Sequence, residues 1–350
     1  MYNRIVADTY TELIAHLKQA NGWLSFDTET TGLHLKADKP FLITITFDNT
    51  SYAIEPREGL QEVFDNMGHF DLVFGHNIKF DLHMLENVGV TYKHDNLADT
   101  MILARLSLET DQMFTIALKA LAKKFLSVDA DEDEKAVKSA LTALKRHNTS
   151  LLKERIKDNG MTKKAFDEVA KDTVYEPLDF HKKFMEEHPE PTYKDIYEDP
   201  LYKDQMLSYA MNDTEITLDL AKLMYPVVIA KDQKSTFERE CKLIKPLFRM
   251  ERVGLNVDRE YIERSRRKTR QYILQKREQL AELAGETVKI GQHKRIKDLF
   301  GERWGVSLQS SDDRALAGVV GGVAYDAAKI IRELRTLEKW YSAYILRLLD

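Results

Sequence analysis

Two carboxylates stand two residues apart at the end of a short apolar run. Asp27 and Glu29 follow Trp23–Phe26 and precede small residues and Gly32. In a β-strand, residues i and i+2 project from the same face, so these two carboxylates are expected to lie side by side. Their repulsion is relieved by a cation, and Mg²⁺ and Mn²⁺ prefer oxygen ligands. Taken alone, such a pair is more often a solvated turn, so a metal site needs support from other segments.

Two further segments supply that support. Asp81 closes the run Phe74–Asp81, which again follows an apolar strand. Tyr209 and Asp213 lie four residues apart in a helical pattern, expected over residues 202–222, and so share one helix face. Four carboxylates and a tyrosine thus come from three separate elements in a fixed order.

In that order, the three segments resemble the three motifs of the DEDD 3′→5′ exonucleases, in the variant with tyrosine in the third motif. The chain most resembles the proofreading domain of family A DNA polymerases, relatives of bacterial DNA polymerase I. Met250–Asp258 is similar to the segment that opens the polymerase region of that family, and the helices expected after it resemble the polymerase thumb. The palm and fingers would follow residue 350. We therefore expect no polymerase activity from this chain alone, which would be the exonuclease part of a split or truncated polymerase.

The expected fold class is α/β. Strands are predicted at residues 23–26, 41–47, 51–54 and 71–74, with helical patterns between them and after them. The resemblance implies a ribonuclease-H-like exonuclease domain, with a mixed five-stranded sheet and helices, followed by an all-helical thumb-like region.

The predicted domains are an exonuclease domain over residues 1–225 and a linker with a thumb-like helical region over residues 226–350. Pro226 suggests the boundary, and a long charged helix is expected at residues 259–284. Residues 127–200 are the least family-like part and are predicted to be a helical insertion.

The charge of the chain is unevenly distributed. Its net charge is −5, but residues 226–350 hold 26 Lys and Arg against 18 Asp and Glu. This basic part suits a nucleic-acid backbone. One cysteine, Cys241, excludes an intramolecular disulfide, and no apolar run approaches membrane-spanning length. We expect a cytoplasmic protein without a membrane partner.

The resemblance also implies roles for the motif residues. Two cations, Mg²⁺ or Mn²⁺, would be held by the four carboxylates. Asp27, Glu29 and Asp213 would hold the first ion, Asp27 would bridge to the second, and Asp81 would act on the second through water. Tyr209 and Glu29 would orient the attacking water, and Tyr209 would position it more than deprotonate it, because a phenol is a poor base at neutral pH.

Further residues are candidates for binding a single-stranded 3′ end or a primer-template DNA. Thr28 and Thr31 could contact the terminal nucleotide, and Leu33 lies where the family places an apolar wedge between bases. Asn77 could bind substrate or cap a helix. Asp99 is predicted to be a helix N-cap and His76 a packing residue. The arginine cluster that contains Arg266 and Arg267 could contact phosphates or could be a solvated face.

Two other functions compete with the DNA exonuclease. A ribonuclease-D-type RNA exonuclease would use the same motifs, although the thumb-like part argues against it. A non-catalytic DNA-binding accessory is the third possibility, although such relics usually lose a ligand and this chain retains all of them. The apolar residues of the last helix, at residues 334–349, suggest a partner that carries the polymerase palm and fingers.

Overall fold

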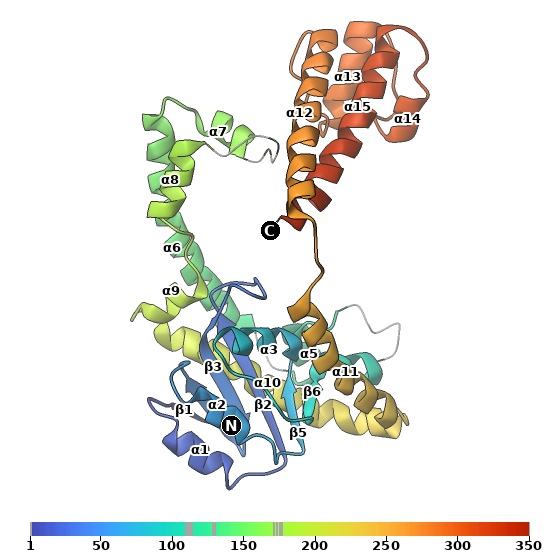
Figure 1. Ribbon diagram of the computed structural model, residues 1–350. Coiled ribbons are helices and arrows are strands. Elements are labelled where there is room, and N and C mark those ends of the chain that lie inside the picture. Colours follow the sequence, from blue (N-terminus) through green and yellow to red (C-terminus); the bar gives the residue numbers. More distant parts are fainter. Residues whose placement is uncertain are drawn as a thin grey trace. The chain divides into compact units, whose positions relative to one another are not determined.

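The computed structural model describes residues 2–108, 115–127, 131–170, 172, 174 and 178–349. These residues form two compact units, each with its own hydrophobic core (Figure 1). The first unit comprises residues 1–152 and 187–254, and the second comprises residues 153–186 and 255–350. The functional division between residues 225 and 226 stays a prediction.

A mixed six-stranded sheet lies at the centre of the first unit (Figure 1). The strand order is β1-β4-β3-β2-β5-β6. β2 pairs antiparallel with β3 and parallel with β5, β3 pairs antiparallel with β4, and β5 pairs parallel with β6. These five strands have the predicted ribonuclease-H-like arrangement. The bounds are β1 (Asn3–Val6), β2 (Trp23–Thr30), β3 (Pro40–Phe47), β4 (Thr50–Ile54), β5 (Leu72–Gly75) and β6 (Leu97–Asp99).

The sheet corrects two details of the prediction. It has six strands instead of five, because β1 adds to the edge and pairs in parallel with β4. β2 also continues to Thr30, so Asp27 and Glu29 lie inside the strand and not after its end. Hydrogen bonding to β3 extends β2 across these polar residues, up to a register shift between Glu29 and Thr30.

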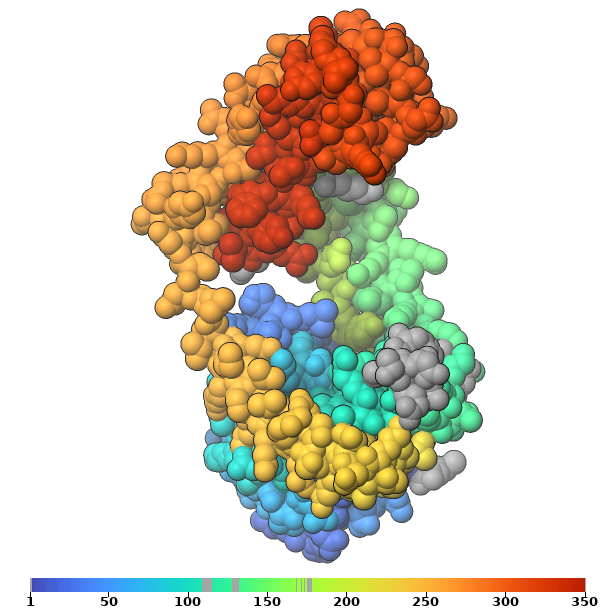
Figure 2. Space-filling view, turned by 90° about the vertical axis from the view of Figure 1, so that its right-hand side faces the viewer, coloured from blue at the N-terminus to red at the C-terminus, as the bar shows by residue number. Residues whose placement is uncertain are grey.

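Helices cover the sheet of the first unit (Figure 1). The longest of them, α10, packs against β2, β3, β4 and β5 and buries Ile216 and Leu220 in the core. α11 packs against α3, α4 and β6, and Figure 2 shows its yellow and orange residues on the surface of the unit. The bounds are α1 (Thr11–Leu17), α2 (Leu60–Asp65), α3 (Ile78–Asn87), α4 (Thr100–Ser107), α5 (Leu118–Phe125), α9 (Tyr193–Glu198), α10 (Lys203–Ala230) and α11 (Lys234–Val253).

α10 does not end where the sequence suggested. It continues through Pro226 to Ala230, beyond the predicted end at residue 222. Proline removes one backbone donor from a helix. Met224 and Val228, on either side of Pro226, are both buried in the core, and this packing stabilises the last turns of the helix.

The second unit is helical, as predicted for the C-terminal region. α12 packs along α15, and both contribute to a core that includes Ile273, Leu280 and Ile331. α12 has the predicted bounds: the Asp258 side chain caps its start by accepting from the Tyr261 N–H (2.8 Å), and Gly285 ends it with φ 75°. The helices are α7 (Lys163–Ala170), α8 (Asp179–Glu187), α12 (Arg259–Ala284), α13 (His293–Trp304), α14 (Asp313–Ala317) and α15 (Gly322–Trp340), followed by a short π-helix (Tyr341–Ile345) and a short 3₁₀-helix (Leu346–Leu348).

The described part of residues 127–200, predicted to be a helical insertion, consists of helices joined by short non-helical segments. It contains α7, α8, α9 and the long helix α6 (Asp131–Asp158), whose residues are divided between the two units. Across the described ranges, no helix is both long enough and apolar enough to cross a membrane.

Candidate active site

Asp27 and Glu29 form the first part of the candidate site, on β2. Glu29 is buried and Asp27 is partly buried. Burial raises the pKa of Asp27 to about 6, against the nearby Lys119 charge and a Thr28 backbone hydrogen bond that lower it. Burial, and then the negative charge of Asp27, raise the pKa of Glu29 well above its ordinary value. The two carboxylates therefore lie close together in a medium that disfavours their charge.

Asp81 reaches this strand from the first turn of α3. Its Oδ1 accepts hydrogen bonds from the Thr28 backbone N–H (3.0 Å) and from the Thr28 hydroxyl (2.6 Å). Burial raises the pKa of Asp81, followed by the negative charge of Asp27. The structure thus brings Asp81 beside Thr28 and Asp27 of β2.

The start of α3 is itself held in place. Asp99 accepts hydrogen bonds from the backbone N–H groups of Asn77 (3.1 Å) and Ile78 (3.0 Å), and from that of Met101 (2.7 Å). The predicted N-cap role of Asp99 is confirmed, and the same carboxylate also fixes the turn that precedes Asp81. Asn77 has φ 66°, in the left-handed region that asparagine tolerates.

α10 contributes Tyr209 and Asp213. Burial raises the pKa of Tyr209, followed by the charges of Glu29 and Asp27, so the phenol faces the β2 carboxylates. Lys119, on α5, donates to Asp213 Oδ1, and its ammonium lies 4.8 Å from the centroid of the Tyr209 ring. The five predicted motif residues therefore come together, with one lysine that the sequence had not indicated.

The donor set fits a hard divalent cation in its chemistry. Carboxylate oxygens are the ligands that Mg²⁺ and Mn²⁺ prefer, and a cation would favour the charged form that burial disfavours here. Within the described ranges, however, no three His, Cys, Asp or Glu side chains are already arranged as a metal centre. Asp213 is instead paired with Lys119, and Asp81 Oδ1 is bonded to Thr28.

The other residues of the first unit that were predicted to contact substrate differ in their exposure and in their hydrogen bonds. The Thr31 hydroxyl donates to Asp38 Oδ1 (2.9 Å) and accepts from the Lys39 N–H (3.1 Å), so it braces its own loop. Leu33 is 83% exposed. Asn77 occupies the N-cap position of α3, but in the described part of the chain its side chain makes no cap hydrogen bond.

His76 is a packing residue, as predicted. Its Nδ1 lies 2.9 Å from Thr100 Oγ1, and burial lowers its pKa to about 4. The imidazole is therefore neutral at physiological pH.

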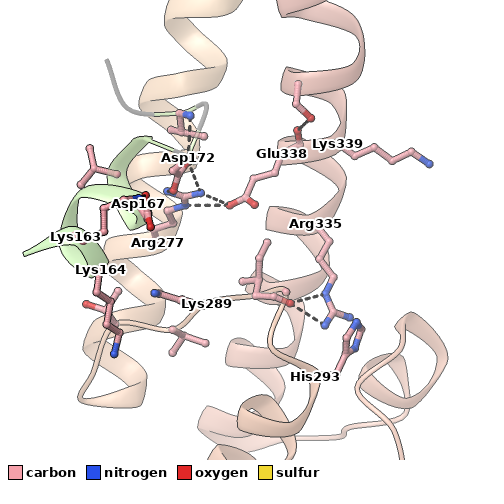
Figure 3. Close-up of a pocket in the computed structure, with 17 residues that line it drawn as sticks. Lys163, Lys164, Asp167, Asp172, Arg277, Lys289, His293, Arg335, Glu338 and Lys339 are labelled. Carbon is pink, nitrogen blue, oxygen red and sulfur yellow. Dashed lines mark hydrogen bonds and ion pairs between the residues drawn. The ribbon is translucent and has the colours of Figure 1, made fainter. Parts of the chain in front are cut away.

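Arg266 and Arg267 lie on α12, in the second unit. Arg266 donates to Glu263 (3.0 Å), one turn before it, and Arg267 is exposed. The second unit also has a pocket of about 1280 Å³, lined by described residues between 163 and 174 and by α12, α15 and the loop before α13 (Figure 3). Neither arginine is among the described residues that line it.

Arg277 is the central ionic group of that pocket. It donates to Asp172 (2.6 Å) and to Glu338 (2.8 Å), and so joins the insertion to α12 and α15 (Figure 3). Arg335 donates to the carbonyl of Ile290 (3.0 Å).

Lys119 is the functional candidate that the sequence analysis missed. α5 carries three lysines, Lys119, Lys123 and Lys124, and nothing in their local sequence distinguishes them. Only the packing of α5 against α10 places Lys119, and not the other two, beside Asp213.

Comparisons with known proteins concern the domain that contains this site. Residues 6–157 match the family model of the 3′–5′ exonuclease domain of A-type DNA polymerases. The chain is 25% identical over 341 residues to DNA polymerase DpoZ of Salmonella phage PMBT28, covering 92% of this chain and 47% of that protein. It is 30% identical over 155 residues to DNA polymerase I of Rhizobium leguminosarum, covering 40% of this chain and 15% of that protein. The chain spans less than half the length of both relatives.

A solved structure extends the likeness to the fold of the whole chain. The POL domain of Pol1 from M. smegmatis, in complex with DNA primer-template and dNTP, matches with a TM-score of 0.60 and 13% identity. The match covers 99% of this chain and 50% of that one, and at this identity it concerns the fold alone. Residues 6–157 are thus similar in sequence to 3′–5′ exonuclease domains of the DNA polymerase A type.

Proposed function

We propose that this chain is a metal-dependent 3′→5′ DNA exonuclease of the proofreading type, which releases nucleoside monophosphates from a 3′ end. One observation carries the proposal: Asp27, Glu29, Asp81, Tyr209 and Asp213 converge from β2, α3 and α10 in a domain whose sequence matches 3′–5′ exonucleases. Such a constellation suits hydrolysis of a phosphodiester by water.

The carboxylates would hold two divalent cations. Asp27, Glu29 and Asp213 are proposed to bind the first, Asp27 to reach the second, and Asp81 to act on the second through water. When bound, the cations would supply a water of lowered pKa and would stabilise negative charge on the phosphate. Thr28 holds Asp81 in position, because two of its donors are bonded to one carboxylate oxygen.

Tyr209 is proposed to position the attacking water as a hydrogen-bond donor. Because burial and the charges of Glu29 and Asp27 raise its pKa, the phenol retains its proton at neutral pH. Glu29 would accept a hydrogen bond from the same water. Glu29 can accept in this way as a carboxylate, which is the form that a bound cation would favour.

The terminal nucleotide is proposed to bind beside this group of residues. The exposed side chain of Leu33 would pack on a base, and Thr28, Thr31 and Asn77 would contribute polar contacts. In the second unit, Arg266 and Arg267 are proposed to contact the phosphate backbone of DNA. DNA is favoured over RNA as the substrate because the relatives described above are DNA polymerases.

We further propose that the palm and fingers of a polymerase act together with this chain, on a second subunit or on the remainder of a longer chain. The support is that the match to DpoZ spans 92% of this chain but 47% of that polymerase. The chain described here would not extend DNA by itself. A primer-extension assay on the isolated chain, with dNTPs and Mg²⁺, should give no product.

The first test is digestion of single-stranded DNA with Mg²⁺. Substrates labelled at the 3′ or the 5′ end should shorten stepwise from the 3′ end, and EDTA or the Asp27→Ala/Glu29→Ala double variant should abolish the reaction. A matched RNA strand should be cut more slowly. Faster cleavage of RNA would favour the ribonuclease-D-type function, and no cleavage of either strand by folded protein would favour the non-catalytic DNA-binding function.

A further inference from the structure

The structure places the ammonium of Lys119 among the site carboxylates. This ammonium donates to Asp213 Oδ1, and the two side chains are only 14% and 11% exposed. It also lies over the face of Tyr209, 4.8 Å from the ring centroid. Four further carboxylates, two on β2 and two on α6, lie within its electrostatic reach: Asp27, Glu29, Asp133 and Glu134.

This arrangement has a direct electrostatic consequence. Several buried carboxylates without a nearby positive charge would repel one another and lose hydration. The Lys119 ammonium offsets part of that cost, because it is held against Asp213 and acts against the burial that raises the pKa of Asp27 and Glu29. A divalent cation that takes Asp213 as a ligand must compete with this ammonium for the same carboxylate.

We propose that Lys119 is the resident counter-ion of this site, which neutralises Asp213 in the metal-free protein and releases it when a divalent cation binds. Lys119 is therefore a positioning residue that weakens the binding of the cation while stabilising the metal-free site. The inference rests on the proposed function, because it takes Asp213 to be a metal ligand.

The first test follows Lys119 in the unaltered protein. Lysines are acylated briefly with a limiting amine-reactive reagent, in EDTA or in Mg²⁺, and the extent at each lysine is measured by mass spectrometry. Mg²⁺ should raise the labelling of Lys119 at least severalfold, because its ammonium loses Asp213. Labelling of Lys123, which is exposed on the same helix, should not change. Equal or lower labelling of Lys119 in Mg²⁺ would overturn the proposal.

The second test measures Mn²⁺ affinity by calorimetry, without any activity assay. Lys119→Met should bind Mn²⁺ about tenfold more tightly than the unaltered protein, which corresponds to about 1.4 kcal/mol. Lys123→Met, the matched charge deletion on α5, should bind as the unaltered protein does, and so should the charge-conserving Lys119→Arg. If Lys119→Met does not fold, the labelling experiment decides.

The outcomes separate this inference from the proposed function. Mn²⁺ binding that requires Asp27 and Glu29, but is no tighter in Lys119→Met, overturns the role of Lys119 alone. If the folded, unaltered protein binds no Mn²⁺ at millimolar concentration, both the counter-ion role and the metal-dependent function are overturned.

Discussion

One oxygen of Asp81 accepts two hydrogen bonds from Thr28, one from its backbone N–H at 3.0 Å and one from its hydroxyl at 2.6 Å. Thr28 stands between the two carboxylates of β2, and Asp81 belongs to α3. This pair therefore fixes the distance between the strand and the helix that carry three of the four candidate ligands. Its geometry makes the site sensitive to the loss of a single hydroxyl.

Thr28→Val should remove the hydroxyl bond while retaining the shape of the side chain and the backbone bond. Hydrogen bonds to charged groups contribute about 1.5–3 kcal/mol, so the free energy of unfolding should fall by about 1–3 kcal/mol. The exonuclease rate should fall more than tenfold, because Asp81 is no longer held. Urea unfolding and digestion of single-stranded DNA measure the two effects. Thr28→Ser retains the hydroxyl, so its free energy of unfolding and its exonuclease rate should stay close to those of the unaltered protein. Equal losses of stability and rate in Thr28→Val and Thr28→Ser would contradict this account.

His76 should make the free energy of unfolding of the protein decrease at acidic pH. Burial lowers its pKa to about 4 in the folded protein, against 6.5 for the free side chain. The contribution of the neutral His76 side chain to the free energy of unfolding is therefore complete above pH 6.5. It is lost as the pH falls from 6.5 through 4. The full difference in the free energy of unfolding corresponds to about 3 kcal/mol.

The measurement compares urea unfolding at pH 7 and pH 4.5. The glutamine side chain in His76→Gln cannot take up a proton. Between pH 7 and pH 4.5, the free energy of unfolding of this variant should therefore fall by about 2 kcal/mol less than that of the unaltered protein. Effects of other titrating groups cancel in that difference. His147→Gln changes an exposed histidine on α6 and should follow the unaltered protein. A His76→Gln curve parallel to that of the unaltered protein would rule out this role.

The sequence predicted the middle of the sheet better than its edges. β2, β3, β4 and β5 contain buried apolar runs, and such runs are visible without tertiary information. β1 has mostly exposed residues and β6 has only three, so pairing with β4 and β5 determines their extended form. The predicted strand count was consequently too low.

In the candidate site, too, some features could be predicted from local sequence and others depend on tertiary packing. Asp27, Glu29 and the Tyr209–Asp213 pair were predictable because strand and helix periodicity place such residues on one face. Lys119 was not predictable, because its role depends on the packing of α5 against α10. Local patterns reveal side chains that share an element, whereas charge compensation between elements requires the fold.

Arg277 of α12 should stabilise the part of the insertion that belongs to the second unit, by linking Asp172 to Glu338 of α15. Its guanidinium bonds to Asp172 and Glu338, and all three side chains are about one quarter exposed. Arg277→Met would leave two carboxylates without this partner, at a cost of about 1–3 kcal/mol after allowance for their exposure. Hydrogen exchange should become faster across residues 163–170. Arg264→Met removes an exposed guanidinium from the same helix, paired with Glu260 at 3.6 Å, and should change exchange little. Equal exchange in both variants would exclude the Arg277 role.

Leu33 should contribute to substrate binding without contributing to stability. Its side chain is 83% exposed, so Leu33→Ala should change the free energy of unfolding by less than about 0.5 kcal/mol. If the side chain packs on a base of the 3′ end, kcat/KM for single-stranded DNA should fall severalfold, since full burial of a leucine side chain contributes about 1.5–3 kcal/mol and Ala retains only part of it. Leu201 is 73% exposed in the same unit and provides the matched control. Leu201→Ala should leave both quantities unchanged, and an equal loss of kcat/KM in the two variants would show that Leu33 has no specific contact with the substrate.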